Sequence, residues 1–453
     1  MARPRLALAC LLLVALAVRL PLLPSTGSRY DTGLYRQWTV TIHQHGLAEA
    51  FSHGFVDYTG YLYVLGLIGF LYGLVNPGFG VHDRTLHMLI KVPGVLGDLL
   101  VAGLLFWLTR RVVEDVLARQ EAGPRSPAAR LGPDGAALVA AGVYLFHPAS
   151  VRLSAHWGQT DSLITAAMVA MAFAAWRGRT ALAWFVLGLG FLVKPHPVVL
   201  APLLGLVSVR QGLRSLVTGG LVAAGTVAAG LAYFVLTDNL RWLVKIYTYL
   251  FNPTQHISNN AWNVWWPAER LLHAKPQDTL LTLGGLEVAY REVASLLVLA
   301  ALGVLVLAFR DRRPVTVLLC AAYLVFTFYM LPAGTLSRYL FPFFALMLPV
   351  VLLEPRWLAF YVPLSVTFFL NISSEVPPDW IGMRLRWNNW ISFPLMAANV
   401  VLFLSFSAAL LMRGRGAVAA APVERVLDLL RAGKEEPGIP SSARRGGVSG
   451  NDG

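Results

Sequence analysis

The sequence has very little cysteine, little charge and no sustained internal repeat. Its two cysteines, Cys10 and Cys320, both lie within apolar runs, so the sequence indicates neither a disulfide framework nor a cysteine-based metal cluster. Only 13% of the residues are charged, whereas soluble globular domains have roughly a quarter. These absences argue against a soluble globular protein.

Long apolar runs dominate the chain instead. Of its 453 residues, 56% are hydrophobic, and the mean hydropathy is +0.60. A helix needs about 20 mainly apolar residues to cross the hydrocarbon core of a membrane. Thirteen candidate runs begin near residues 6, 58, 86, 135, 160, 180, 196, 216, 292, 315, 339, 357 and 391. The composition predicts an all-α, polytopic membrane protein.

The net charge of +13 is distributed as in a membrane protein and does not indicate a nucleic-acid partner. Short basic turns contain Arg177 with Arg179, Arg210 with Arg214, and the segment 310–313. The turns at 154–160 and 332–337 have no lysine or arginine. Since cytoplasmic loops carry the excess of basic residues, this pattern predicts which turns face the cytosol.

With a cytosolic amino terminus, the basic turns all face the cytosol only if one of the thirteen runs does not cross the membrane. The segment from Asp57 to Leu74 is the misfit, and its tyrosines and glycines suit an interfacial helix on the outer face. We therefore expect about twelve transmembrane helices and an interfacial helical outer loop, with both termini cytosolic. The outer segments are then 24–85, the turn 154–160 and the loop 238–291.

This topology predicts one membrane domain, residues 1–412, and a cytosolic tail, residues 413–453. The tail is rich in Gly, Ser, Arg and Glu and is expected to be mostly disordered, with one short helix at 423–430. The runs 180–193 and 196–209 are short and meet at Lys194-Pro195-His196-Pro197. They cross tilted or form a partial hairpin, which would place Lys194 in a recess.

Two polar segments are expected at the outer mouth of the bundle. The first outer loop begins with Arg29-Tyr30-Asp31-Thr32-Gly33-Leu34-Tyr35-Arg36-Gln37-Trp38. A polar island, His156-Trp157-Gly158-Gln159-Thr160-Asp161, separates two apolar runs. Acids inside membrane bundles usually face a partner or a substrate path. Aromatic rings with hydrogen-bonding acids suit a sugar, and an interfacial aromatic belt with an exposed acid is the alternative.

Further motifs follow in a consistent order along the chain. They are Arg19, Asp31-x3-Tyr35-x2-Trp38, Lys91-x-Pro93-x4-Asp98, the polar island, Lys194-Pro195, Asn260-Ala261-Trp262-Asn263-Val264-Trp265 and Ser337-Arg338-Tyr339. In this order the chain resembles the GT-C superfamily of integral-membrane glycosyltransferases, and within it the bacterial relatives of GPI-anchor and dolichol-dependent mannosyltransferases. One departure is the segment Asp57-Tyr58-Thr59-Gly60-Tyr61, where many relatives have Tyr-Pro-Pro.

The resemblance implies an inverting transfer of a single hexose, with mannose favoured, from a polyprenyl-phosphate-sugar donor. It implies a bacterial-type plasma membrane, a site on its outer face, membrane lipids as surroundings, and a glycan, lipid or protein acceptor. It implies no nucleotide sugar. By the same resemblance Asp31 is the general base. Asp161 is either a second site acid or an amino-terminal helix cap with Thr160.

Cationic and aromatic residues supply candidate substrate contacts. Arg338 and Lys194 are expected to bind the phosphate, although Arg338 could instead be an interfacial residue that reaches toward water. The other candidate contacts are His196, Tyr35, Trp38, His156, Trp157, Gln159 and Asn263. No cofactor and no metal ligand are predicted, and a divalent ion that bridges the two acids is the alternative.

Lys91 and Asp98 lie seven residues apart and therefore share a face of one helix. They can pair with each other, pair with Arg19 or Arg152 on other helices, or take part in catalysis. A transporter or flippase of a lipid-linked or anionic substrate would also place acids and arginines in a bundle, and it is the alternative function. Such proteins often show repeats and broken helices near the midplane. A non-catalytic membrane scaffold is a third possibility.

Overall fold

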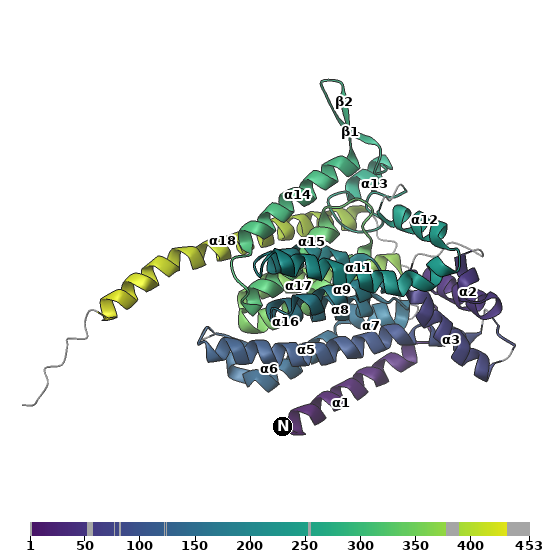
Figure 1. Cartoon of the computed structure of the whole chain (residues 1–453), viewed down its shortest axis with the longest axis horizontal. Helices are drawn as coiled ribbons and strands as arrows, with labels where there is room; N and C mark the ends of the chain where they lie inside the picture. Colours follow the sequence, from purple (N-terminus) through teal and green to yellow (C-terminus); the bar gives the residue numbers. More distant parts are fainter. Residues whose placement is uncertain are drawn as a thin grey trace, which may run out of the picture.

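The computed structural model describes residues 2–51, 58–76, 78–80, 83–121, 123, 125–251, 255–376 and 389–432. Helices make up nearly all of this structure (Figure 1). The α-helices are α1 (Ala2–Arg19), α2 (Arg29–His45), α3 (Tyr61–Val75), α4 (Arg84–Leu89), α5 (Val92–Ala118), α6 (Pro127–Leu145), α7 (Pro148–Val151), α8 (Asp161–Trp176), α9 (Thr180–Val193), α10 (Ala201–Val209), α11 (Leu213–Leu236), α12 (Leu240–Phe251), α13 (Trp266–Leu272), α14 (Tyr290–Ala308), α15 (Pro314–Met330), α16 (Phe341–Leu353), α17 (Leu358–Glu375) and α18 (Asn389–Ala432).

Short helical turns and one hairpin complete the described chain. The 3-10 turns are η1 (Leu20–Leu22), η2 (Leu47–Phe51), η4 (His196–Leu200), η5 (Ser337–Leu340) and η6 (Pro355–Trp357), and η3 (Arg152–Trp157) is a π-helix. The antiparallel strands β1 (Thr279–Leu283) and β2 (Leu286–Ala289) pair across a Gly284-Gly285 turn. Both glycines have positive φ, as hairpin turns of this length require.

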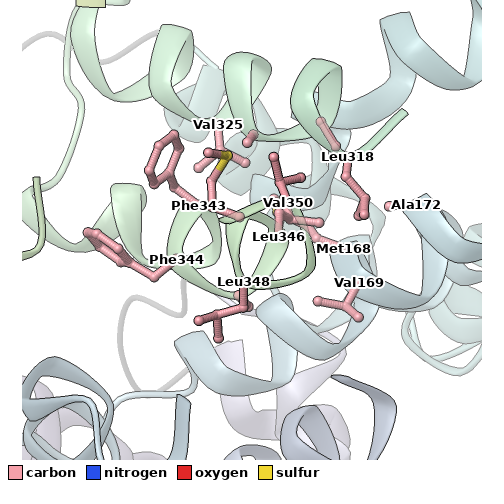
Figure 2. Packing of buried hydrophobic residues seen from close by; sticks show 14 of the residues in the cluster. Met168, Val169, Ala172, Leu318, Val325, Phe343, Phe344, Leu346, Leu348 and Val350 are labelled. Carbon is pink, nitrogen blue, oxygen red and sulfur yellow. The ribbon is translucent and has the colours of Figure 1, made fainter. Parts of the chain in front are cut away.

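Helix α16 lies at the centre of the bundle. All 13 of its residues are buried, and it packs on α5, α6, α8 and α15. A helix that is apolar on every face is stable in such a position because each face meets a neighbouring helix. Figure 2 shows this packing for side chains of α8, α15 and α16, with Met168, Leu318 and Phe343 among the residues that meet.

The helices that carry the polar motifs lie at one end of the bundle. In Figure 1, α2 and α3 lie side by side at that end, and α5 extends from there toward the opposite end. Gly60, just before α3, donates its backbone N–H to the carbonyl of Leu192 near the end of α9 at 2.9 Å. This hydrogen bond joins the start of α3 to α9, the helix that precedes Lys194.

The described helices agree with an integral membrane protein. Six of them are long and apolar enough to cross a membrane, or seven if the bent pair Pro127–Leu145 and Pro148–Trp157 is one span. Six shorter apolar helices, of 10–17 residues, accompany them. The all-α prediction is thus confirmed, whereas the count of twelve crossings and the cytosolic placement of the termini stay predictions.

Two expected segments are helical in the structure. The expected interfacial segment contains α3, and Asp57 lies outside the described residues. Helix α18 continues to Ala432, past the expected boundary at 412, and includes the short helix expected at 423–430. Residues 433–453 lie outside the described part. The division into a membrane domain and a tail stays a prediction.

Candidate active site

Asp31 lies in the first turn of α2, where a cap fixes the helix start. The Ser28 hydroxyl oxygen accepts a hydrogen bond from the backbone N–H of Asp31 at 3.2 Å, and the Thr32 hydroxyl donates to the Ser28 carbonyl at 2.7 Å. A serine before the first turn supplies an acceptor to an otherwise unpaired helical N–H. The cap therefore holds the Asp31 backbone, and its carboxylate can serve another partner.

The polar island forms the end of the wide π-helical turn η3, the three residues after it and the start of α8. Lys91 Nζ donates to the carbonyl of His156 at 2.9 Å and to the carbonyl of Ser25 at 2.6 Å. Lys91 thereby ties the island to the chain just before α2. The indole Nε1 of Trp157 donates to Oδ2 of Asp31 at 2.7 Å. The island therefore contacts the first turn of α2, which carries Asp31.

A second buried set of contacts, around Asp98, holds the π-helical turn η3 that leads into the polar island. Asp98 pairs with Arg19 at 3.0 Å and accepts hydrogen bonds from Tyr144 at 2.9 Å and from Ser154 at 2.5 Å. Arg19 also donates to the Leu145 carbonyl and to Ser150, both at 2.8 Å. Of the pairings that the sequence left open, the one between Arg19 and Asp98 is present. These contacts give Asp98 and Lys91 structural roles.

Arg338, in η5, lies between the two candidate acids. Its Nη2 is 3.9 Å from Oδ1 of Asp31, and its Nε is 3.6 Å from Oδ2 of Asp161. Its guanidinium carbon lies 5.5 Å from the centre of the Trp157 ring, a cation–π distance. One guanidinium therefore faces both carboxylates and the indole that binds Asp31.

Lys194 completes the charged cluster. It follows α9 at the break before Pro195, and its Nζ is 3.0 Å from Oδ1 of Asp161. The same Nζ lies 5.0 Å from the ring centre of Tyr339 and 5.5 Å from that of Tyr58. Asp161 is not a side-chain cap, because its carboxylate pairs with two cations and Thr160 makes no side-chain cap hydrogen bond.

The two acids differ in exposure. The Asp31 side chain is 17% exposed, whereas that of Asp161 is 1% exposed. Burial alone would raise the pKa of Asp31, but the Arg338 guanidinium and the hydrogen bonds from Trp157 and Ser28 outweigh it and hold that pKa below its usual value. Asp31 is thus held in its ionised form and is partly exposed, whereas Asp161 is buried.

The aromatic residues predicted as contacts on α2 are buried against rings at the start of α3 and just before it. Tyr35 and Trp38 are 2% and 4% exposed. The Tyr35 ring meets Tyr61 edge-on at 5.6 Å, and the Trp38 ring meets Tyr58 at 6.4 Å. Burial raises the pKa of Tyr35 well above its usual value, so its hydroxyl stays neutral. Tyr35 and Trp38 therefore pack within the protein, next to the helix turn that carries Asp31.

The remaining predicted contacts are all buried, but they differ in their partners. His196 stacks on Tyr339 at 4.4 Å and on Phe328 at 5.2 Å, and neither ring nitrogen has a hydrogen-bond partner among the described residues. The same holds for both amide atoms of Gln159. His156 is fully buried. Hydrogen bonds to the Tyr329 carbonyl and from the Trp265 backbone occupy the Asn263 side chain, at 3.2 and 3.0 Å.

The described residues contain no group of three or more His, Cys, Asp or Glu side chains placed to hold a metal ion. Asp31 and Asp161 instead face Arg338 and Lys194. Chemically, two carboxylates beside two cations form a set that can accept a proton and bind an anion.

A model of a known family matches this chain. Residues 85–332 match Glycosyltransferase family 87. The chain belongs to this family. The matched segment includes Lys91, Asp161 and Lys194, while Asp31 precedes it and Arg338 follows it. The family confirms that the protein is a glycosyltransferase and supports the expected resemblance to GT-C membrane enzymes.

The transferase is similar to ArnT from Cupriavidus metallidurans, solved bound to undecaprenyl phosphate, with 18% sequence identity and a TM-score of 0.46. That similarity covers 95% of this chain and 81% of ArnT. No curated protein matches the sequence.

The structure also brings beside the charged cluster residues that were not among the predicted contacts. The hydroxyl of Ser337, next to Arg338, donates to Glu375 at the end of α17. Glu375 is thus a third acid beside the cluster. Tyr58 and Tyr339 face Lys194. Tyr339 belongs to a motif, and Tyr58 lies in the expected interfacial segment, but no sequence spacing indicated that both would face one lysine.

Proposed function

We propose that this transferase moves a single hexose, with mannose favoured, from a polyprenyl-phosphate carrier to a hydroxyl group of a glycan, lipid or protein acceptor. We place the reaction at the outer face of the membrane. The observation that supports this best is Arg338, which lies within 3.9 Å of Asp31 and 3.6 Å of Asp161. A base and a phosphate-binding cation are thereby adjacent, as sugar transfer from a phosphate requires.

In the proposed reaction Asp31 takes the proton of the acceptor hydroxyl. The hydroxyl oxygen attacks the anomeric carbon from the face opposite the phosphate, so one carbon–oxygen bond forms as the other breaks. The bonding electrons leave with the phosphate oxygen. A single displacement of this kind inverts the anomeric configuration. Asp31 suits the role because its carboxylate is ionised and reachable.

Arg338 and Lys194 would stabilise the phosphate as it takes up negative charge. An arginine can bind two phosphate oxygens in parallel, and a lysine acts as a point charge. Asp161, 3.0 Å from Lys194, would hold both cations at the place where the charge develops. The nearby Gln159 and His196 have polar atoms available for sugar hydroxyls.

The test supplies membranes that contain the transferase with a panel of radiolabelled polyprenyl-phosphate sugars and, separately, with nucleotide sugars. Transfer to acceptors should occur from a polyprenyl-phosphate sugar and disappear in Asp31→Asn. Transfer from nucleotide sugars alone would refute the proposed donor. Lipid movement without a new glycosidic bond would support the transporter alternative instead.

The side of the reaction needs its own test. Single cysteines that replace Tyr30, which is 76% exposed, and Arg312, which is also exposed, should react with an impermeant thiol reagent from opposite sides of sealed membranes. The cysteine at position 30 should label from outside. Labelling at position 30 only from the cytosolic side would overturn the outer-face assignment.

A further inference from the structure

A hollow rich in arginine lies at the end of the bundle away from the candidate active site. It has a volume of about 390 Å³. We name it the arginine hollow, and its lining residues are Arg119, Trp176, Arg177, Asp311, Arg312 and Arg313. They come from three separate parts of the chain: the end of α5, the turn after α8 and the turn before α15.

The length of α5 places the arginine hollow relative to the membrane. Lys91 lies at the start of this helix, against the polar island, and Arg119 lies at its end. Its 27 residues correspond to about 40 Å at the usual rise per residue. A bilayer with its headgroups is about 40–45 Å thick. By its length α5 therefore reaches from the level of the candidate active site to the headgroup level of the opposite leaflet, where Arg119 and the hollow lie.

The arginine hollow has more positive than negative charge. Arg119 pairs with Asp115 at 3.0 Å, and Arg313 pairs with Glu121 at 3.3 Å and with Asp311 at 3.5 Å. In the described part of the chain, no carboxylate lies within 4.0 Å of Arg177 or Arg312. Two guanidinium groups thus remain for an anion.

One wall of the hollow is aromatic. Trp176 is 9% exposed, and the Arg177 guanidinium carbon lies 5.4 Å from its ring centre. Tryptophan is common at the level of lipid headgroups, and basic pockets between membrane helices on the cytoplasmic side bind acidic headgroups. The positive-inside rule accounts for arginines in these turns, but it does not require three turns to converge around one indole.

We propose that the arginine hollow binds a phosphate-bearing anion, with Arg177 and Arg312 as the main contacts. Arginine suits this ligand because its guanidinium can donate two parallel hydrogen bonds to phosphate. The phosphate can come from an anionic lipid of that leaflet or from a free polyphosphate. This site is independent of the proposed sugar transfer, since it lies at the end of α5 opposite the one that contacts the polar island, about 40 Å away along the helix.

The experiment places the whole protein in phosphatidylcholine nanodiscs and follows thermal unfolding. One arm replaces part of the lipid with phosphatidylglycerol, and the other adds inorganic pyrophosphate. The test variant is Arg177→Gln with Arg312→Gln. The control is Arg111→Gln with Arg356→Gln, which removes the same charge from side chains that are 53% and 65% exposed. All variants are first compared in pure phosphatidylcholine, to show that they fold.

Wild type and control should be stabilised by at least one of the two anions. The Arg177/Arg312 variant should need at least tenfold more of that anion for the same stabilisation. Stabilisation by phosphatidylglycerol alone would identify a lipid headgroup as the ligand, and by pyrophosphate alone a free phosphate. The proposal is overturned if neither anion stabilises wild type, or if the test and control variants respond equally.

Discussion

The indole N–H of Trp157 is hydrogen-bonded to the carboxylate of Asp31 at 2.7 Å, although the two residues are 126 positions apart. Trp157 also has the Arg338 guanidinium 5.5 Å from its ring centre. Trp157 therefore orients Asp31, the proposed base, and contacts Arg338, the residue proposed to bind the phosphate. The following predictions test this arrangement.

Replacement of Asp31 by Asn should lower kcat by about 10²–10⁴, because a general base contributes that much to proton transfer. Donor binding should change little, since the amide keeps the shape of the carboxylate. The control is Asp238→Asn, at an exposed position with φ of 61° that asparagine also tolerates. Transfer rates and donor binding to purified protein check both changes. Unchanged turnover in the Asp31 variant would exclude Asp31 as the base.

Replacement of Trp157 by Phe should shift the acid limb of the rate profile to higher pH. The Trp157 hydrogen bond is one of the contacts that hold the pKa of Asp31 below its usual value of about 3.9. A lowered pKa keeps the base ionised as pH falls, so loss of the hydrogen bond makes it protonate earlier. The pH dependence of kcat/KM for both proteins measures this. A limb that moves to lower pH, or does not move, contradicts the assignment.

Replacement of Arg338 by Lys should raise the donor KM about tenfold or more and also lower kcat. The variant keeps a positive charge but cannot bind phosphate through two parallel hydrogen bonds. Arg338→Gln should be worse, because it also leaves Asp31 and Asp161 without this counter-charge. Steady-state kinetics with varied donor show the order. Equal kinetics for Lys and Arg at this position would mean that only the charge matters.

Disruption of the buried pair between Arg19 and Asp98 should destabilise the protein. Both side chains are fully buried, and removal of one partner leaves an unpaired charge, at a cost of about 3–5 kcal/mol. Arg19→Met with Asp98→Leu should therefore unfold at a higher temperature than either single variant. Thermal unfolding in detergent measures all three. Additive losses in the double variant would show that the two residues are not energetically coupled.

Replacement of Gly94 by Ala should reduce both stability and transfer. A Cβ at this position would lie 2.5 Å from the carbonyl oxygen of Gln159, and overpacking of this kind costs about 1–3 kcal/mol. Gly103→Ala is the matched control, since it lies on the same helix with nothing within 4 Å of its Cβ position. Equal effects of the two changes would show that α5 does not position the island.

The topology and the resemblance of the motifs predicted that four charged residues lie near one end of the bundle, and the roles of these residues in the reaction stay predictions. Asp31, Asp161, Lys194 and Arg338 each stand in a motif at an expected outer end of a helix, and the distribution of basic turns placed those ends together. A topology argument needs only the ends of helices. The structure agrees with it, since the four side chains form one set of ion pairs.

Pairwise contacts could not be predicted in this way. Glu375 has no motif, and its hydrogen bond from Ser337 depends on how α17 packs beside η5. Asn263 shows the reverse, because its motif suggested a sugar contact while the fold uses both ends of its amide. Such choices depend on tertiary packing, which a single sequence does not contain. The sugar, the acceptor and the number of crossings stay predictions.

The turn that leads into α2 tolerates no side chain. Gly27 has φ of 56°, and a Cβ there would collide with the carbonyl oxygen of His156. At Gly27 the segment that carries Asp31 thus packs directly against the backbone of the polar island, with no side-chain atoms between them. Any larger residue at position 27 would push the segment that carries Asp31 away from the polar island. The geometry of the candidate site thus depends on the absence of a side chain at Gly27, a residue that contacts no substrate in the proposed mechanism.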